Sequence, residues 1–411
     1  MIPPLNIAMV AACPFPTSQG SQVLIRELSE ALVRRGHSLH IVTYHFGEDQ
    51  PCPGLTIHRI PELFRYNKFR SGPEIRKPIL DLLLALKLDQ VVRRHNISII
   101  HTHNYEAPVA SYPVRLLRKI PVVYHSHNTM SDEFYTYFRL KIPQVLAKWA
   151  AYLLDRFIPR RADFVIAINR QVADFLIQMG TPASKIKFIP PGIDFGSIDD
   201  PPDPSIRQRL DLGNGPLIIY AGNLDGYQRM DLLLNALPGV FKNHPTAKLV
   251  ILTSSKPDQI KRDAESCGIK KNIVFVMNPD FSLVRQVLLS GSVAVNPRIS
   301  WSGYPIKLLN YMAAGLPVVA FEGAAPPVEN ELNGLLAPSG DTKAFGRLIC
   351  DLLSRPDRAK RLGKEAEKTV ALNHNWDVIA TQVERIYARL LGLDPIVIER
   401  IHKHDRESVT A

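Results

Sequence analysis

Hydrophobic positions along the chain fall into two kinds of segment that alternate from one end to the other. Short apolar runs, typical of buried strands, alternate with longer segments in which apolar residues recur at helical spacing. In the first part of the chain the strand-like runs lie at residues 6–10, 39–44, 97–104, 121–129 and 162–169. Strands that alternate with helices in this way predict an α/β fold with parallel sheets.

The second part of the chain continues this alternation. Its strand-like runs lie at residues 216–224, 247–254, 272–278, 293–297 and 318–320. No internal repeat is evident beyond these two similar α/β halves. At 411 residues the chain is too long for one ordinary core and long enough for two. The pattern therefore predicts two α/β domains.

Residues 303–320 are the stretch around which the second half is organised. Residues 303–305 have the composition of a turn, and apolar residues recur at helical spacing from Ile306 onward. Gly315 is suited to the left-handed conformation that ends a helix. Because ligands of parallel sheets bind outside the carboxyl ends of the strands, the loop and helix start form a candidate anion site.

Lys307 is an unusual residue for the first turn of this predicted helix. The helix macrodipole disfavours a cation at that end, so the choice makes sense if a bound phosphate offsets the charge. A solvated lysine on a surface helix is the alternative interpretation.

Residues 311–320, YMAAGLPVVA, closely resemble the signature of retaining glycosyltransferase family 4, which comprises nucleotide-sugar enzymes with the GT-B fold. The family also has a Glu-x7-Glu pair, and here Ser302 and Asn310 stand at its two positions. The first strand, loop and helix resemble the N-terminal unit of the family. Gly20 keeps the second glycine of its loop, whereas Gln19 replaces the first.

The resemblance implies two Rossmann-like domains, each a doubly wound parallel sheet, that face a cleft. We expect an N-terminal acceptor domain at residues 1–190 and a proline-rich hinge at 191–205, which resembles the hinge of the family. A nucleotide-sugar domain is expected at 206–375, and a terminal helix at 376–397 that returns to the first domain. The polar residues 398–411 are expected to form a flexible tail.

The resemblance also implies which residues bind the donor. Asn223 stands where the family has an arginine, and Gln228 or Arg229 stands where it has a lysine. The neutral amide of Asn310 can donate to and accept from ribose hydroxyls. The expected donor-binding residues are Gly20, Asn223, Arg229, Ser302, Gly303, Tyr304, Pro305, Ile306, Lys307 and Asn310. The loop that begins with Met277 and Asn278 is expected to contact the base.

Two pairs of histidines end neighbouring predicted strands, His101 with His103 and His125 with His127. The resemblance places the active-site histidine of the family at His127, where an imidazole can hydrogen-bond a sugar hydroxyl. For His103 we favour a structural role at the edge of the core. Because each pair has i, i+2 spacing on a strand, its side chains point the same way, and a metal site remains an alternative.

The net charge of +11 is unevenly distributed. Residues 1–199 carry 24 Lys and Arg against 16 Asp and Glu, whereas residues 200–411 carry 26 against 23. A basic first half suggests an anionic acceptor or an anionic membrane surface, although a solvated face is the simpler interpretation. The aromatic and basic stretch 134–161 fits either a membrane surface or a helix packed on the sheet. Nucleic acid is not an expected partner, since only charge favours it.

The cellular setting is expected to be the cytoplasm, with possible peripheral contact at the inner face of the membrane. The four cysteines have neither disulfide-framework nor zinc-site spacing, which fits a reducing compartment. The N-terminus lacks the basic region of a signal peptide. No apolar run approaches the roughly 20 residues that a membrane-spanning helix requires.

The combined prediction is a retaining glycosyltransferase of the hexosyltransferase type. It would move a sugar from a nucleotide-sugar donor to a saccharide or lipid-linked saccharide acceptor in envelope or exopolysaccharide biosynthesis. The chain has no Asp-x-Asp motif, so neither a metal nor another cofactor is expected. Because Ser302 and Asn310 replace the glutamates, a non-catalytic GT-B scaffold that binds sugar nucleotides is the alternative. An epimerase or phosphorylase on the same architecture is a minor third interpretation.

Overall fold

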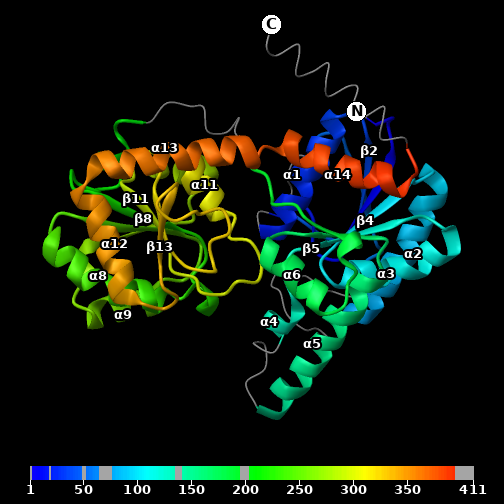
Figure 1. The fold of residues 1–411 in the computed structure, drawn as a ribbon, viewed down its shortest axis with the longest axis horizontal. Coiled ribbons are helices and arrows are strands. Elements are labelled where there is room, and N and C mark those ends of the chain that lie inside the picture. The colour runs from blue at the N-terminus through cyan, green and yellow to red at the C-terminus, as the bar shows by residue number, and fades with distance from the viewer. Residues whose placement is uncertain are drawn as a thin grey trace, which may run out of the picture. The chain divides into compact units, whose positions relative to one another are not determined.

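The computed structural model describes residues 2–17, 20–48, 52–63, 76–134, 141–194 and 203–393. They belong to two units, Met1–Gly192 with Trp376–Ala411, and Ile193–Asn375 (Figure 1). Gln19, residues 195–202 of the predicted hinge and the predicted tail at 398–411 lie outside the described residues. Each unit has its own sheet.

The first unit is built on a seven-stranded sheet in the order β3-β2-β1-β4-β5-β6-β7. Every neighbouring pair is parallel. The central strands are buried along their length, which explains why the sequence shows continuous apolar runs rather than alternation. The strands are β1 (Asn6–Ala11), β2 (Ser38–Thr43), β3 (Leu55–Arg59), β4 (Ile99–His103), β5 (Val122–Ser126), β6 (Phe164–Ala167) and β7 (Ile186–Phe188).

Helices flank this sheet, and the last of them comes from the end of the described chain. Glu384 of that helix accepts hydrogen bonds from the guanidinium of Arg35 at 2.7 and 2.8 Å, and its Oε1 lies 3.0 Å from Nε2 of His37. Burial raises the pKa of Glu384, but these partners outweigh burial and lower it to about 2. The helices are α1 (Gly20–Arg34), α2 (Lys77–His95), α3 (Glu106–Arg118), α4 (Met130–Glu133), α5 (Lys141–Arg161), α6 (Arg170–Gln178) and α14 (Trp376–Leu390).

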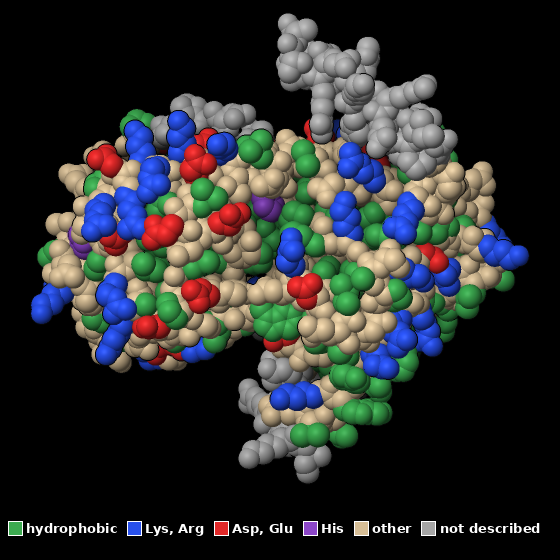
Figure 2. Space-filling view, in the orientation of Figure 1, with side chains coloured by type: hydrophobic (Ala, Val, Ile, Leu, Met, Phe, Trp, Pro, Cys, Tyr) green, Lys and Arg blue, Asp and Glu red, His purple; other side chains and the backbone are tan. Residues whose placement is uncertain are grey.

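The helix α5 keeps an apolar face in solvent. Val145, Leu146 and Trp149 expose 66, 63 and 65% of their surfaces, and Tyr152 and Phe157 are also exposed. Figure 2 shows hydrophobic side chains gathered along this helix. A contiguous exposed apolar surface of this kind is typical of an interaction site rather than of scattered surface residues.

The second unit is built on a six-stranded parallel sheet in the order β10-β9-β8-β11-β12-β13. Its strands are β8 (Leu217–Ala221), β9 (Lys248–Thr253), β10 (Ile273–Met277), β11 (Val293–Asn296), β12 (Val318–Phe321) and β13 (Gly334–Ala337). Its helices are α7 (Ile206–Arg209), α8 (Met230–Asn243), α9 (Asp258–Ser266), α10 (Phe281–Leu289), α11 (Lys307–Ala313), α12 (Thr342–Ser354) and α13 (Pro356–Asn373). A short 3-10 turn, η3 (Gly226–Gln228), precedes α8, and another, η4 (Lys270–Asn272), precedes β10.

Both sheets have the strand order of a doubly wound fold, as the resemblance to glycosyltransferase family 4 implied. The order reverses direction between β1 and β4 in the first unit and between β8 and β11 in the second. The crevice outside the carboxyl ends of strands at such a reversal is the usual ligand position in open α/β sheets. The organising stretch forms the predicted elements, with α11 beginning at Lys307, Gly315 at φ 69° and β12 following.

Candidate functional site

At the reversal point of the second unit, the backbone at the end of β8 is hydrogen-bonded to a side chain of α11. The hydroxyl of Tyr311 accepts a hydrogen bond from N–H of Ala221 at 2.7 Å and donates to its carbonyl at 3.1 Å. Gly222 follows with φ 144°, and its N–H donates to the carbonyl of Leu252 at 3.0 Å. The φ of Gly222 disfavours any other residue, and a Cβ there would lie 3.2 Å from Nζ of Lys307 and displace it by a few tenths of an ångström.

Lys307 lies against the end of β8. Its Nζ donates to Oε1 of Gln228 at 2.7 Å and to the hydroxyl of Tyr220 at 3.1 Å. It also lies 4.3 Å from the centre of the Tyr220 ring, within cation–π range. Among the described residues no carboxylate pairs with Lys307. The ammonium group of Lys307 therefore contacts neutral groups, and its positive charge remains able to attract an anion.

The pKa of Lys307 is strongly perturbed. Burial, together with the nearby guanidinium of Arg298, lowers it from the usual 10.5 to about 7. A lysine of this kind is close to half-protonated at neutral pH, and an anion bound beside it would favour the charged form. Because α11 is only seven residues long, we assign anion attraction here to Lys307 and Arg298 rather than to a helix dipole.

Arg298 is a functional candidate that the sequence reasoning missed. It follows the end of β11, donates a hydrogen bond to the carbonyl of Ser302 and lies 5.5 Å from the centre of the Tyr227 ring. Its position in the sequence could have identified it. A basic residue that follows a strand at the reversal point lies at the edge of the sheet where ligands bind. Its contact with Ser302 also holds the loop that leads into α11.

The loop after β8 divides the predicted donor residues into two groups. Asn223 donates to the hydroxyl of Tyr227 at 2.9 Å and accepts from Nε2 of Gln228 at 3.1 Å, so it belongs to the same network as Lys307. Arg229 instead forms a bidentate ion pair with Asp231, at 2.9 and 2.8 Å. Of the two residues that the sequence offered for the usual lysine position, Gln228 is the one that contacts Lys307.

The remaining predicted donor residues surround the start of α11. Ser302 and Tyr304 are buried, and Gly303 adopts φ 82°. The carbonyls of Pro305 and Ile306 each accept a backbone hydrogen bond at 2.9 Å and so form the first turn. Asn310 lies one turn after Lys307 and is partly exposed, and its side-chain amide has no hydrogen-bond partner within the described part of the chain.

Three predicted residues belong to elements other than β8 and α11: Met277 and Asn278 at the end of β10, and Gly20 in the first unit. Met277 is exposed at the carboxyl end of β10, which is separated from β8 by β9. Asn278 follows with φ 49°, and its N–H donates to the carbonyl of Thr253 at 2.9 Å. Gly20 begins α1 in the first unit, and apart from its neighbours along the chain no atom of the described residues lies within 4 Å of a Cβ placed there. The backbone at Gly20 is therefore open to an approaching group.

The carboxyl ends of β4 and β5 in the first unit hold four stacked imidazoles, those of His101, His103, His125 and His127. Neighbouring rings are 4.6 to 5.4 Å apart between centroids. All four side chains are buried. Burial lowers the pKa of His127 to about 4, and burial together with His127 lowers that of His101 to about 3. The cluster is therefore neutral at physiological pH.

Hydrogen bonds within this cluster determine which nitrogen of His127 carries hydrogen. The sulfur of Met9, 3.4 Å from Nε2 of His103, can only accept, so His103 carries hydrogen on Nε2. Nδ1 of His103 must then accept from Nε2–H of His127, 2.9 Å away. Nδ1 of His127 is left as a buried acceptor without a partner among the described residues. It can accept a hydrogen bond from a hydroxyl group.

The same cluster bears on the metal alternative that the histidine spacing left open. His101, His103 and His125 each offer one nitrogen within 4.8 Å of the others. However, Nδ1 of His101 lies 2.6 Å from the hydroxyl of Tyr387 on α14, and both nitrogens of His103 have partners. Nε2 of His101 and Nδ1 of His125, by contrast, are buried and have no hydrogen-bond partner among the described residues, so His103 is the residue that would lose contacts if the three bound an ion.

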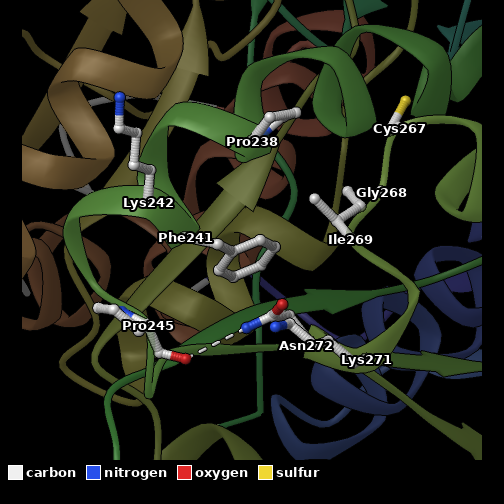
Figure 3. Close-up of a pocket in the computed structure, with 9 residues that line it drawn as sticks. All are labelled: Pro238, Phe241, Lys242, Pro245, Cys267, Gly268, Ile269, Lys271 and Asn272. Carbon is white, nitrogen blue, oxygen red and sulfur yellow. Dashed lines mark hydrogen bonds between the residues drawn. The ribbon is translucent and has the colours of Figure 1, made fainter.

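A surface pocket of about 220 Å³ lies elsewhere in the second unit (Figure 3). Its lining includes Phe241 near the end of α8 and Asn272 before β10, and Nδ2 of Asn272 donates to the carbonyl of Pro245 at 3.4 Å. These residues precede β9 and β10, so the pocket is at the amino-terminal edge of the sheet. It is separate from the ligand edge at which Lys307 lies.

Two family models match the chain. The model described as Glycosyltransferase Family 4 matches residues 18–196, and the model described as Glycosyl transferases group 1 matches residues 215–355. The chain is similar to a D-inositol 3-phosphate glycosyltransferase of Segniliparus rotundus, with 25% identity over 88% of this chain and 82% of the relative. It is also similar to a phosphatidyl-myo-inositol mannosyltransferase of Mycobacterium leprae, with 24% identity over 93% and 96%.

Solved structures show the same fold. Sucrose-phosphate synthase from Thermosynechococcus elongatus has a TM-score of 0.80 at 20% identity, over 95% of this chain and all of that one. Anabaena HepE in complex with UDP and glucose has a TM-score of 0.74 at 16% identity, over 94% of this chain and all of that one. The two family models together cover most of the chain, and the two sheets have the expected strand order. The chain therefore belongs to glycosyltransferase family 4 and is a glycosyltransferase with the GT-B fold.

Proposed function

We propose that this glycosyltransferase moves a sugar, with retention of anomeric configuration, from a nucleotide-sugar donor to a saccharide or lipid-linked saccharide acceptor in envelope or exopolysaccharide biosynthesis. The observation that carries the donor assignment is the environment of Lys307. This half-buried cation is held by Gln228 and Tyr220 at the end of β8, and no described carboxylate neutralises it. The diphosphate of the donor supplies the missing negative charge.

The chemistry of the leaving group agrees with this assignment. Negative charge grows on the diphosphate as the glycosidic bond breaks, and fixed cations beside it stabilise that charge. Lys307 and Arg298 fill this role without a metal ion, and the amide of Asn310, which has no partner among the described residues, binds the ribose hydroxyls. In the first unit, Nδ1 of His127 accepts a hydrogen bond from a hydroxyl of the saccharide. Retention is proposed from family membership.

The first unit supports a lipid-linked acceptor. The exposed apolar residues of α5 include Trp149, and Lys148 and Arg156 on the same helix add positive charge. No helix among the described residues is long and apolar enough to span a bilayer, so we propose peripheral contact with an anionic membrane. Two of the relatives are named for inositol phosphate or phosphatidyl-inositol substrates. Wild-type protein should sediment with anionic vesicles more than a Trp149→Glu variant; equal sedimentation would remove α5 from the contact.

A thermal-shift screen tests the donor assignment. UDP, GDP, ADP and their common sugar conjugates are added with and without EDTA, each compared with nucleotide-free protein in the same buffer. A ligand that binds only the folded state raises the melting temperature, so we expect one base to give a shift that EDTA does not change. The nucleotide sugar that binds is then assayed for transfer. No shift with any nucleotide contradicts the proposal, and binding without transfer to any acceptor favours the non-catalytic scaffold.

A further inference from the structure

A second histidine cluster lies in the first unit, away from the ligand edge. His40 is on β2, His58 is on β3, and His95 is the last residue of α2. Nδ1 of His40 lies 3.0 Å from Nε2 of His58. The ring of His95 is centred 4.2 Å from that of His40 and 5.1 Å from that of His58. One nitrogen from each residue lies within 4.8 Å of the other two.

The cluster is at the amino-terminal edge of the sheet. The helix α2 leads into β4, so its last residue lies where the strands begin. Nδ2 of Asn6, the first residue of β1, donates to the carbonyl of His95 at 2.9 Å and confirms this position. By contrast, His103 and His127 lie at the carboxyl ends of the strands. A ligand held by His95 would therefore not occupy the transfer site.

The geometry is close to that of a tri-histidine metal centre. Two imidazole nitrogens bound to one tetrahedral zinc ion lie roughly 3.3 Å apart, as follows from Zn–N bonds of about 2.0–2.1 Å. The 3.0 Å between His40 and His58 is a hydrogen bond in the metal-free protein, and an ion that displaced its proton would find these two nitrogens near the required spacing. The nitrogen of His95 lies within 4.8 Å of both and completes the set by moving toward them. The His95 imidazole has no hydrogen-bond partner among the described residues, so binding a metal breaks no other contact of its ring.

Access and chemistry distinguish this cluster from the four stacked imidazoles. His58 and His95 are partly exposed, which gives a hydrated ion an entry path, whereas His101, His103, His125 and His127 are all buried. The charge of Lys87 acts unfavourably on His58, although its Nζ is engaged with Oε1 of Gln90 at 3.1 Å. Three imidazoles without a carboxylate favour zinc, copper, nickel or cobalt over magnesium or calcium.

We propose that His40, His58 and His95 bind one divalent transition-metal ion, with Zn²⁺ as the reference ion and water at the fourth position. The ion joins the edge strand β3 to β2 and to the end of α2, and so stabilises the outer part of the first sheet. It has no role in sugar transfer, and the proposal is independent of the donor assignment.

Metal titration of the full chain tests the site. Protein freed of metal with EDTA and dialysed is titrated with Zn²⁺ in a calorimeter, and with Co²⁺ followed by its visible spectrum. We expect one ion per chain, a cobalt spectrum of tetrahedral type and a higher melting temperature with zinc. Because their side chains are partly exposed, His58→Gln and His95→Gln together should leave the fold intact. They should weaken zinc binding by more than about tenfold.

The matched control is His244→Gln, since His244 is also partly exposed but lies in the second unit, where its Nε2 faces Oγ of Ser354 at 3.2 Å. This control should bind zinc as the wild type does. No bound ion in the wild type overturns the proposal, as does equal binding by the His58/His95 variant, which would place the ion elsewhere. If the double variant fails to fold, His58→Gln alone and the cobalt spectrum of the wild type decide the question.

Discussion

The two units present different chemistry at the same edge of the same kind of sheet. In the second unit, this edge carries Lys307, which contacts Gln228 and Tyr220, and Arg298, which donates to the carbonyl of Ser302. In the first unit, the corresponding edge carries four buried imidazoles that are uncharged at physiological pH. Topology supplies both edges, but the side chains decide what each can bind.

This contrast fits two different binding roles, in which the second unit binds the charged diphosphate and the first unit binds sugar hydroxyls. A diphosphate needs fixed positive charge, which is strongest where water is partly excluded, as at Lys307. A sugar hydroxyl needs an oriented neutral acceptor, and Nδ1 of His127, which has no partner in the part of the chain that the structure describes, is one. Loss of a group from the edge of the first unit should therefore reduce transfer and spare nucleotide binding, whereas loss of a group from the edge of the second unit should reduce nucleotide binding.

The largest effect is expected from His127→Ala. Sugar transfer should fall by about a hundredfold or more, as for loss of one oriented hydrogen-bonding group in an active site, while nucleotide binding stays near the wild-type value. Single-turnover assays measure transfer, and calorimetry measures nucleotide affinity. His244→Gln serves as the matched control for a histidine substitution outside the edge. If nucleotide binding is lost instead, the proposed division between the two edges is wrong.

A smaller and opposite effect is expected from Lys307→Met, which removes the charge at similar volume. Nucleotide affinity should fall roughly ten- to a hundredfold, or about 1–3 kcal/mol, because a charge-assisted hydrogen bond to phosphate is lost. Calorimetry with the nucleotide found in the thermal-shift screen measures this change. An unchanged dissociation constant would remove Lys307 from the donor site.

The pH dependence of nucleotide affinity also tests whether the charge of Lys307 contributes to binding. With a pKa of about 7, Lys307 is mostly charged below that pH and mostly neutral above it, so nucleotide binding above pH 7 must be coupled to proton uptake. Affinity in the wild type should therefore fall as the pH rises from about 7 to 9, a range in which the terminal phosphate is already mostly ionised. Lys307→Met should lose this dependence, and Lys307→Arg should bind with little change across the range.

The smallest effect is expected from Arg229→Ala, which is the control for Lys307. Arg229 forms an ion pair with Asp231, and an exposed ion pair of this kind contributes about 0–1 kcal/mol to the stability of the fold. Nucleotide affinity should change less than about twofold. A loss as large as that of Lys307→Met would mean that Arg229 leaves Asp231 to bind the donor.

Local features of the site were predictable because they depend on residues close together in the chain. The turn before Ile306, the helix that follows and the left-handed Gly315 all follow from side-chain periodicity and backbone preference. The position of Lys307 at the start of that helix was likewise predictable. The partners of Lys307 were not, since Gln228 lies 79 residues away and its approach depends on how β8 and α11 pack.

Side-chain periodicity was enough to predict the alternation of strands and helices, the two-sheet architecture and the polar residues that follow strand ends. It could not predict that Met9, through His103, leaves Nδ1 of His127 as an acceptor, because these residues meet only in the folded sheet. The tertiary structure alone also brings His40, His58 and His95 together at the opposite edge. The physical reason is that periodicity reports which face of an element is buried, whereas hydrogen-bond partners depend on the order and register of strands that are not consecutive in the chain.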